Sequence, residues 1–376
     1  MTNIPIKVGL QGFGFIGKVH AQAYQSIPFA YPHPTTTAKI NAIMRINTEG
    51  DKKFIQSLGS PVVTADNETF YQQDLDLIDI CTPNKFHKDH ALEAIAHKKH
   101  VYLEKPLGMN LPEAREIAEA ARFSGVLTHT AFMMRFYPAV QQAKAIIASG
   151  VLGEIYHFRA HYFHNSYMDP KRPISWRLQH ASSGGGALAD LGVHIIDMTR
   201  YLLGEANSVS CQTRTYINER PESIGSSKLI SVDVDDWALC TIGLKNGGQG
   251  LIEVTRLSGG MGDSARMEIY GKLGSVVIDL GDPIKCEYYD QKTKQFHSGG
   301  IDFPIPEDEV PQTKCWPSSK TSLGYFLNAH TASVYYFLGC IHDGVQSTVN
   351  FEDAVKTQEV LEAAYRSADS NSETIK

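Results

Sequence analysis

A glycine-rich turn between a short apolar strand and an amphipathic helix constrains the fold of this chain more than any other feature. The segment LQGFGFIGKVH, residues 10–20, spaces Gly12, Gly14 and Gly17 as GxGxxG. The run IKVGL before it predicts a buried strand, and apolar residues recur at helical spacing after it. Strand, glycine turn and helix in this order are typical of a dinucleotide-binding βαβ unit.

Each glycine has its own physical role in such a turn. Gly12 permits the sharp turn, Gly14 removes a side chain so that a pyrophosphate can approach the backbone, and Gly17 lets the helix pack close to the strand. Free N–H groups and the helix dipole then favour an anion at the start of the helix. A glycine turn without a ligand is the alternative, and the flanking strand and helix favour cofactor binding.

Residues 1–131 alternate between strand and helix patterns. The strand candidates are IKVGL, KINAIM, PVVTA, LDLIDIC, HVYLE and GVLTHTAF, and helical patterns lie between most of them. This alternation predicts a Rossmann domain of α/β class, in which ligands bind beyond the carboxyl ends of parallel strands. The side chains expected there belong to Arg45, to CTPN at 81–84 and to EKP at 104–106.

The pattern changes to paired strands after about residue 150. EIYHFRAHYF alternates with period two, and the segments 234–257 and 265–280 each join two strands through glycine turns. We therefore predict a second domain of α+β class over residues 132–350, with a large open, mainly antiparallel sheet. A final amphipathic helix at about 351–368 could pack back on the Rossmann domain.

Composition limits the partners of the chain. Its 376 residues have a formal net charge of −6 and no run of lysine or arginine, which argues against nucleic acid. No apolar stretch of about 18 residues and no secretory signal pattern is present, so we expect no membrane association. The six cysteines are scattered without a CxxC pair, as in reduced thiols of a cytoplasmic protein.

Two segments contain candidate catalytic residues. In residues 182–204, Asp190 and His194 share a predicted helix face, where a carboxylate can orient a histidine that transfers a proton. Lys105 follows the strand HVYLE, where it could stabilise negative charge on a substrate oxygen. A solvated Asp–His pair and a surface lysine are the alternatives.

Taken in order, these segments resemble the glucose–fructose oxidoreductase, inositol dehydrogenase and rhizopine-catabolism (Gfo/Idh/MocA) family of NAD(P)-dependent oxidoreductases. The resemblance covers nearly the whole chain through GFGFIG, CTPNKFH, EKPLG, RFYPAVQQAKAIIASGVLGEI, SWR, GGGALADLGVHIID and LEAAYRSA. It implies a Rossmann domain, a second domain with a large open sheet, and a homo-oligomer (dimer or tetramer) formed through that sheet.

The resemblance also implies the site residues. Lys105, Asp190 and His194 correspond to the catalytic trio, and Tyr162 and Trp176 join them as candidate substrate contacts. The implied cofactor contacts are Gly12, Gly14, Gly17 with the intervening Phe15 and Ile16, Thr82, Pro83, Asn84, His87, Glu104 and Lys105, with Trp176 and Arg177 nearby.

The resulting hypothesis is hydride transfer between C4 of a nicotinamide and a secondary hydroxyl or ketone of a sugar, inositol or related polyol. His194 takes the hydroxyl proton, Lys105 holds the oxygen and Asp190 orients His194. Two alternatives use the same fold. One is a redox-neutral enzyme that oxidises its substrate transiently to cleave a glycosidic bond or eliminate a group, and the other is a non-catalytic dinucleotide sensor.

The cofactor can be NAD or NADP. Arg45 ends the strand KINAIM, where NAD sites usually place an acidic residue. An arginine can pair with a 2′-phosphate, so we favour NADP, whereas Asn47 or Asp51 could bind the ribose instead.

We expect no metal site. His157, His161 and His164 are close in sequence, but no cysteine or carboxylate nearby completes a ligand set. Tyr162 and Trp176 could form an apolar floor under a sugar ring, although core packing is their commoner use.

Overall fold

The structure, a computed structural model, describes residues 5–298 and 315–376. The chain divides into two units, Met1–Phe136 with Lys314–Val355 and Tyr137–Thr313 with Lys356–Lys376. Each unit thus contains two separate stretches of sequence. The limits 1–131 and 132–350 stay a prediction, because compact units defined by their contacts need not coincide with domains.

A six-stranded parallel sheet forms the centre of the first unit, with the strand order β3-β2-β1-β4-β5-β6. The order reverses between β1 and β4, so their carboxyl ends border the crevice where such sheets bind ligands. This topology confirms the predicted Rossmann fold. The strands are β1 (Ile6–Gln11), β2 (Ala38–Met44), β3 (Val62–Thr64), β4 (Leu77–Ile80), β5 (His100–Leu103) and β6 (Thr128–Thr130).

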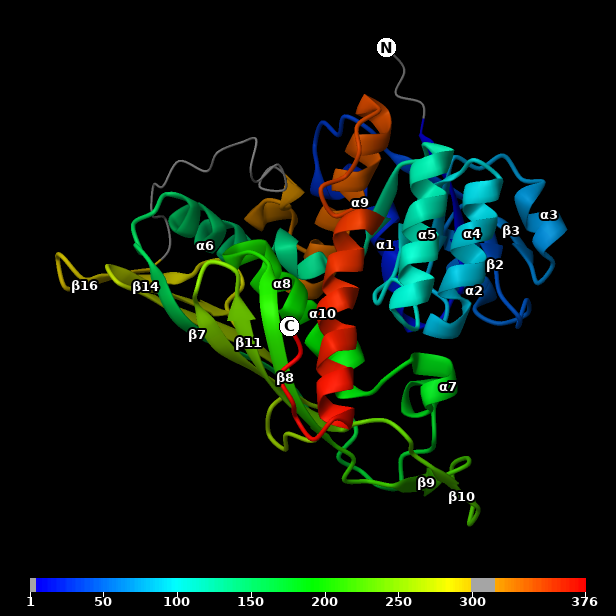
Figure 1. Ribbon diagram of the computed structural model, residues 1–376. Coiled ribbons are helices and arrows are strands. Elements are labelled where there is room, and N and C mark those ends of the chain that lie inside the picture. Colours follow the sequence, from blue (N-terminus) through cyan, green and yellow to red (C-terminus); the bar gives the residue numbers. More distant parts are fainter. Residues whose placement is uncertain (1–4, 299–314) are drawn as a thin grey trace. The chain divides into compact units, whose positions relative to one another are not determined.

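The helices of the first unit include a segment from near the C-terminus. Ile27 of α1 shares one apolar core cluster with Phe337 and Leu338 of α9, so the late part of the sequence completes this core. Helices α4 and α5 lie side by side (Figure 1). The helices are α1 (Phe15–Ala30), α2 (Lys52–Ser57), α3 (Asn67–Tyr71), α4 (His87–Ala96), α5 (Leu111–Ser124) and α9 (Tyr325–Asp343), with 3-10 turns η1 (Asn84–Phe86), η2 (Met133–Phe136) and η6 (Ser319–Thr321).

An eight-stranded sheet dominates the second unit, in the order β16-β15-β14-β13-β7-β12-β11-β8. Neighbouring strands are antiparallel except β7 and β12, so the predicted, mainly antiparallel sheet is confirmed. The strands are β7 (Ile155–His164), β8 (Ala206–Arg214), β11 (Trp237–Leu244), β12 (Gln249–Thr255), β13 (Asp263–Gly271), β14 (Gly274–Asp279), β15 (Glu287–Asp290) and β16 (Gln295–Ser298), with β9 (Glu219–Pro221) and β10 (Leu229–Ser231) forming a separate pair.

Helices of the second unit cover one face of this sheet. Phe158, Ala160 and Tyr162 of β7 are buried as their alternation predicts, whereas Tyr156 near the strand start is half exposed. The helical elements are α6 (Pro138–Ala148), η3 (Trp176–Leu178), α7 (His180–Ser183), η4 (Leu188–Gly192), α8 (Val193–Leu203) and α10 (Phe351–Asp369), of which α10 begins in the stretch assigned to the first unit. Within the described ranges, no helix combines the length and apolarity that crossing a membrane requires.

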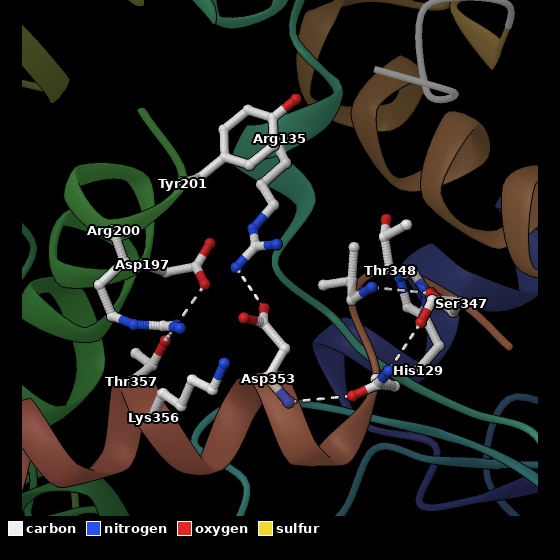
Figure 2. A network of polar contacts seen from close by, with 12 residues as sticks. His129, Arg135, Asp197, Arg200, Tyr201, Ser347, Thr348, Asp353, Lys356 and Thr357 are labelled. Atoms are coloured by element: carbon white, nitrogen blue, oxygen red, sulfur yellow. Dashed lines mark hydrogen bonds and ion pairs between the residues drawn. The ribbon is translucent and has the colours of Figure 1, made fainter. Parts of the chain in front are cut away.

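A buried ion pair joins two distant segments of the first unit and provides a test of its packing. Arg135 Nη2 lies 2.6 Å from Asp353 Oδ2, and only 5% of the arginine side chain is exposed (Figure 2). Replacing Asp353 by Ala leaves the guanidinium without this carboxylate, a change that costs about 3–5 kcal/mol at full burial. We expect the melting temperature, measured by circular dichroism, to fall by several degrees.

Two control variants separate this effect from general damage. The double variant Arg135→Met with Asp353→Leu should regain part of the lost melting temperature, because apolar side chains can replace a buried ion pair. Glu49→Ala, which breaks an exposed pair with Lys52, should change the melting temperature little. An equal loss in Asp353→Ala and Glu49→Ala would contradict the importance of the buried pair.

Candidate functional site

Two of the three fingerprint glycines are required by packing alone. Gly12 has φ +92°, and a Cβ there would lie 2.8 Å from the carbonyl oxygen of Cys81. A Cβ on Gly17 would lie 2.3 Å from the carbonyl oxygen of Gly12, because the first turn of α1 packs directly against the end of β1. These two positions therefore exclude larger residues whether or not a ligand binds.

Gly14 differs from its neighbours. It is the N-cap of α1 with φ −78°, which any residue can adopt, and no atom lies within 4 Å of the position a Cβ would take. The first turn of α1 has no acidic side chain, while Phe15 is 72% exposed and Ile16 is partly buried. The structure thus leaves open the space at the helix start that a pyrophosphate requires, so a dinucleotide fits these residues.

The loops after β4 and β5 are joined by His87. Its Nδ1 lies 2.8 Å from the carbonyl oxygen of Pro106 and its Nε2 lies 3.0 Å from that of Thr82. Burial lowers the pKa of His87, and a neutral ring donates a hydrogen bond to only one of these two carbonyl oxygens. The structure therefore places His87 between the backbone of Thr82 and that of Pro106. Its own cofactor contact and those of Thr82, Pro83 and Asn84 stay predictions.

Glu104 and Lys105 follow directly on β5. The backbone N–H of Lys105 donates to Glu104 Oε2 at 3.1 Å, and Glu104 Oε1 lies 3.3 Å from His20 Nε2. Burial opposes ionisation of Glu104, but His20 and Lys105 outweigh it and lower its pKa to about 2. The Glu104 carboxylate thus holds the backbone of Lys105 at the carboxyl edge of the sheet.

Beyond β2, the predicted NADP residue Arg45 already has an acidic partner. Its Nη1 lies 2.9 Å from Asp51 Oδ2, and Lys18 Nζ lies 2.8 Å from Asp51 Oδ1. Lys18 and Arg45 lower the pKa of Asp51, which is therefore a carboxylate at neutral pH. Asn47 accepts hydrogen bonds from the backbone of Glu49 and Gly50 and shapes the same turn.

In the second unit, Asp190 lies in a π-helical turn and His194 in the first turn of α8. The π-turn η4 covers residues 188–192, so the α-helical spacing on which the shared face was predicted holds only from Val193 onward. Asp190 Oδ2 lies 3.2 Å from Arg256 Nη2, and His194 is 6% exposed, with its ring 6.3 Å from that of Tyr162. Such π-turns are frequent at functional sites.

Two further polar residues of α8, Asp197 and Tyr201, make contacts within the second unit. Asp197 is 1% exposed and accepts a hydrogen bond from Thr357 Oγ1, which in turn accepts one from Arg200 (Figure 2). The carbonyl oxygen of Tyr201 accepts a hydrogen bond from Lys144. These two residues therefore stabilise the second unit rather than form a solvated surface.

Sequence analysis missed Arg256 and Asp235, which hold the glycine segment before the π-turn. Arg256 is 1% exposed and donates to the carbonyl oxygens of Gly186 and Arg177 as well as to Asp190. Asp235 accepts from the backbone N–H groups of Gly186 and Leu188. Neither residue belongs to a recognisable motif, and only the pairing of distant segments brings them to this place.

Trp176 and Arg177 lie in the 3-10 turn η3. The Arg177 guanidinium carbon lies 4.3 Å above the ring of Trp176. Tyr162 is 7% exposed, and burial together with the nearby Asp263 raises the pKa of its hydroxyl. The contacts of all three with cofactor or substrate stay predictions.

Two family models match this chain. The model described as an oxidoreductase family with an NAD-binding Rossmann fold matches residues 6–132. The model described as the GFO/IDH/MocA C-terminal domain matches residues 140–277. Together they cover more than half of the sequence.

Individual relatives agree with these matches. Levoglucosan dehydrogenase from Pseudarthrobacter phenanthrenivorans is 31% identical over 96% of each chain. The scyllo-inositol 2-dehydrogenase (NAD(+)) of Bacillus subtilis is 30% identical over 80% of this chain and 77% of its own. A solved structure of levoglucosan dehydrogenase in complex with NADH has a TM-score of 0.89 at 30% identity and covers 99% of both chains.

The open space at Gly14 generates a test of dinucleotide binding. Gly14→Ala should fold normally, because no atom lies within 4 Å of the new methyl group. The methyl group should nevertheless obstruct a pyrophosphate and weaken NADH binding by about tenfold or more, which corresponds to about 1.4 kcal/mol. NADH fluorescence titration and the melting temperature measure the two effects.

Gly339→Ala is the matched control. At Gly339, too, no atom lies within 4 Å of the position a Cβ would take, and the residue lies within α9 of the same unit, where alanine suits a helix better than glycine. This variant should keep both stability and NADH binding. Unchanged NADH affinity in Gly14→Ala would show that the cofactor does not occupy the open space at Gly14.

Proposed function

Because this chain belongs to the Gfo/Idh/MocA oxidoreductase family, we propose that it oxidises a secondary hydroxyl of a sugar, inositol or related polyol, or reduces the corresponding ketone. The observation that carries this proposal is the full-length similarity to levoglucosan dehydrogenase, together with inositol dehydrogenases among the other relatives. The dehydrogenase activity follows from the family, and the substrate is the part proposed.

The proposed roles of the residues follow their chemistry. A bound nicotinamide supplies the hydride acceptor at its C4 atom. Lys105 donates a hydrogen bond to the substrate oxygen and stabilises negative charge there. His194 takes the hydroxyl proton, and Asp190, paired with Arg256, is the carboxylate that orients it.

We further propose NAD as the cofactor, in place of the NADP preference predicted from Arg45. Asp51 binds both Arg45 and Lys18, so neither cation is available to a 2′-phosphate without losing this carboxylate. Asp51 also repels a phosphate, whereas it can accept hydrogen bonds from ribose hydroxyls. The NADH complex of the levoglucosan dehydrogenase is consistent with this choice.

A homo-oligomer formed through the large sheet is also proposed. Leu251 on β12 is 46% exposed and Phe296 on β16 is 70% exposed, so apolar surface is present on these strands. Burial of such side chains favours association of protein surfaces. Light scattering of the purified chain measures the assembly directly.

Turnover on a defined substrate panel tests the main proposal. NADH formation is followed by absorbance with levoglucosan, myo-inositol, scyllo-inositol and a set of aldoses as substrates. Lys105→Met should lower kcat by about 100-fold or more on any active substrate, because loss of one charge-stabilising donor has that effect in other enzymes. NADH binding should change little.

Lys53→Met removes a lysine from an exposed position of α2 in the same unit and is the control. It should keep full activity. Near-normal turnover of Lys105→Met would overturn the role of Lys105, and NADH binding without turnover on any polyol would overturn the proposed substrate class.

Cofactor choice has its own test at Asp51. Asp51→Asn removes the negative charge that neutralises Arg45 and Lys18, so NADPH should gain about tenfold in affinity relative to NADH. Glu49→Gln removes an exposed negative charge from the same turn and should leave the ratio unchanged. Fluorescence titrations with both cofactors give the ratio, and a wild-type preference for NADPH would contradict the proposal.

A further inference from the structure

Two buried histidines of the first unit lie beside Glu104 and have no role in the function proposed above. His20 is on α1 and His330 is on α9, and both are at most 2% exposed. Their rings are 5.1 Å apart, and Glu104 Oε1 lies 3.3 Å from His20 Nε2. One donor atom from each of the three residues lies within 4.8 Å of the other two.

The imidazole of His20 is oriented by contacts at Nδ1, the ring nitrogen that does not face Glu104. Its Nδ1 lies 3.1 Å from both carboxylate oxygens of Asp79 and 3.2 Å from Cys81 Sγ. A proton on Nδ1 that is donated to Asp79 leaves the lone pair of Nε2 directed toward Glu104 and His330. A carboxylate that fixes one histidine nitrogen while the other binds a metal is a common arrangement in metalloproteins.

The nitrogens that face this space have few hydrogen-bond partners. Among the described residues, neither ring nitrogen of His330 has a hydrogen-bond partner, and Nε2 of His20 has only its 3.3 Å approach to Glu104 Oε1. A buried polar atom without a partner costs about 1–3 kcal/mol, so such atoms in a native core point to an occupant.

Glu104 is also fixed for a ligand. Its Oε2 accepts the backbone N–H of Lys105, so Oε1 is the oxygen directed toward His20. Asp79 is fully buried and Glu104 is 7% exposed, so two carboxylates lie close together in the core.

We propose that His20, Glu104 and His330 bind one divalent first-row metal ion, for which Zn²⁺ is the best match. Two imidazole nitrogens and one carboxylate oxygen form a ligand set that zinc uses, with a water molecule in the fourth position. The ion joins α1, the end of β5 and α9, and thereby fastens the late segment Lys314–Val355 to the sheet. The role inferred for the ion is to stabilise the first unit, and the inference does not depend on the proposed function.

Metal content of the purified chain is the primary test. The protein is expressed without a polyhistidine tag in zinc-supplemented medium, purified without chelator and analysed by inductively coupled plasma mass spectrometry. We expect about one zinc ion per chain and a melting temperature that falls after removal of the ion and recovers with added Zn²⁺. Replacement by Co²⁺ should give the visible absorption of a tetrahedral site.

His330→Gln and His129→Gln form a matched pair of variants. His129 is also fully buried in this unit, but Ser347 and Ser333 partner its two nitrogens. His330→Gln should lose the zinc and the response to Zn²⁺, whereas His129→Gln should keep both. If His330→Gln fails to fold, the metal content of the wild-type chain still decides.

Substoichiometric metal in the wild type, with no change of melting temperature on adding Zn²⁺, would overturn the site and leave a proton on His20 or a buried water as its occupant. Zinc retained by His330→Gln would assign the ion to other residues and would also overturn it. None of these measurements uses a substrate or cofactor. An active enzyme without zinc therefore refutes this inference alone, and a zinc-containing chain without turnover refutes only the proposed function.

Discussion

The close approach of α1 to the ends of β1 and β4 is the constraint on which the first unit depends. A methyl group at Gly17 would lie 2.3 Å from the backbone of Gly12, and one at Gly12 would lie 2.8 Å from that of Cys81. With these contacts fixed, α1 starts at the carboxyl edge of the sheet, and its exposed N–H groups meet the open space at Gly14. The segments that follow β4 and β5 reach the same edge because the strands are parallel.

The sequence was sufficient for the fold because the signals that specify it are local. Apolar runs and helical periodicity depend on neighbouring residues, and the period-two alternation of β7 predicted its buried face apart from Tyr156. The same reasoning could not find His330, Asp353 or Arg256. Each of them contacts a residue more than 60 positions away, as in the Arg256–Asp190 pair. Such a contact exists only in the folded chain and leaves no local pattern in the sequence.

Arg45 shows how a local rule can give an incomplete answer. The rule takes an acidic residue at the end of β2 as a sign of NAD and a basic residue as a sign of NADP. Arg45 at this position therefore predicted NADP. In the structure the functional group at this place is a cluster, because Asp51 adopts a left-handed conformation at φ +58° and brings its carboxylate to Arg45 and Lys18. Two cations and one carboxylate, rather than a single arginine, therefore determine the charge at this end of β2.

The residues proposed for the cofactor and those proposed for the substrate are stabilised in different ways within their own units, and this difference bears on how substrate range can change. In the first unit, backbone contacts and His87 fix the segments 81–84 and 104–106, so few side chains there can vary. In the second unit, the buried charges of Arg256 and Asp235 hold the glycine segment and Asp190 in place. Trp176 and Arg177 lie in a short 3-10 turn, and it is the backbone carbonyl of Arg177 that accepts from Arg256. Under the proposed roles, substrate range can therefore change in the second unit while the cofactor segments of the first unit stay constant.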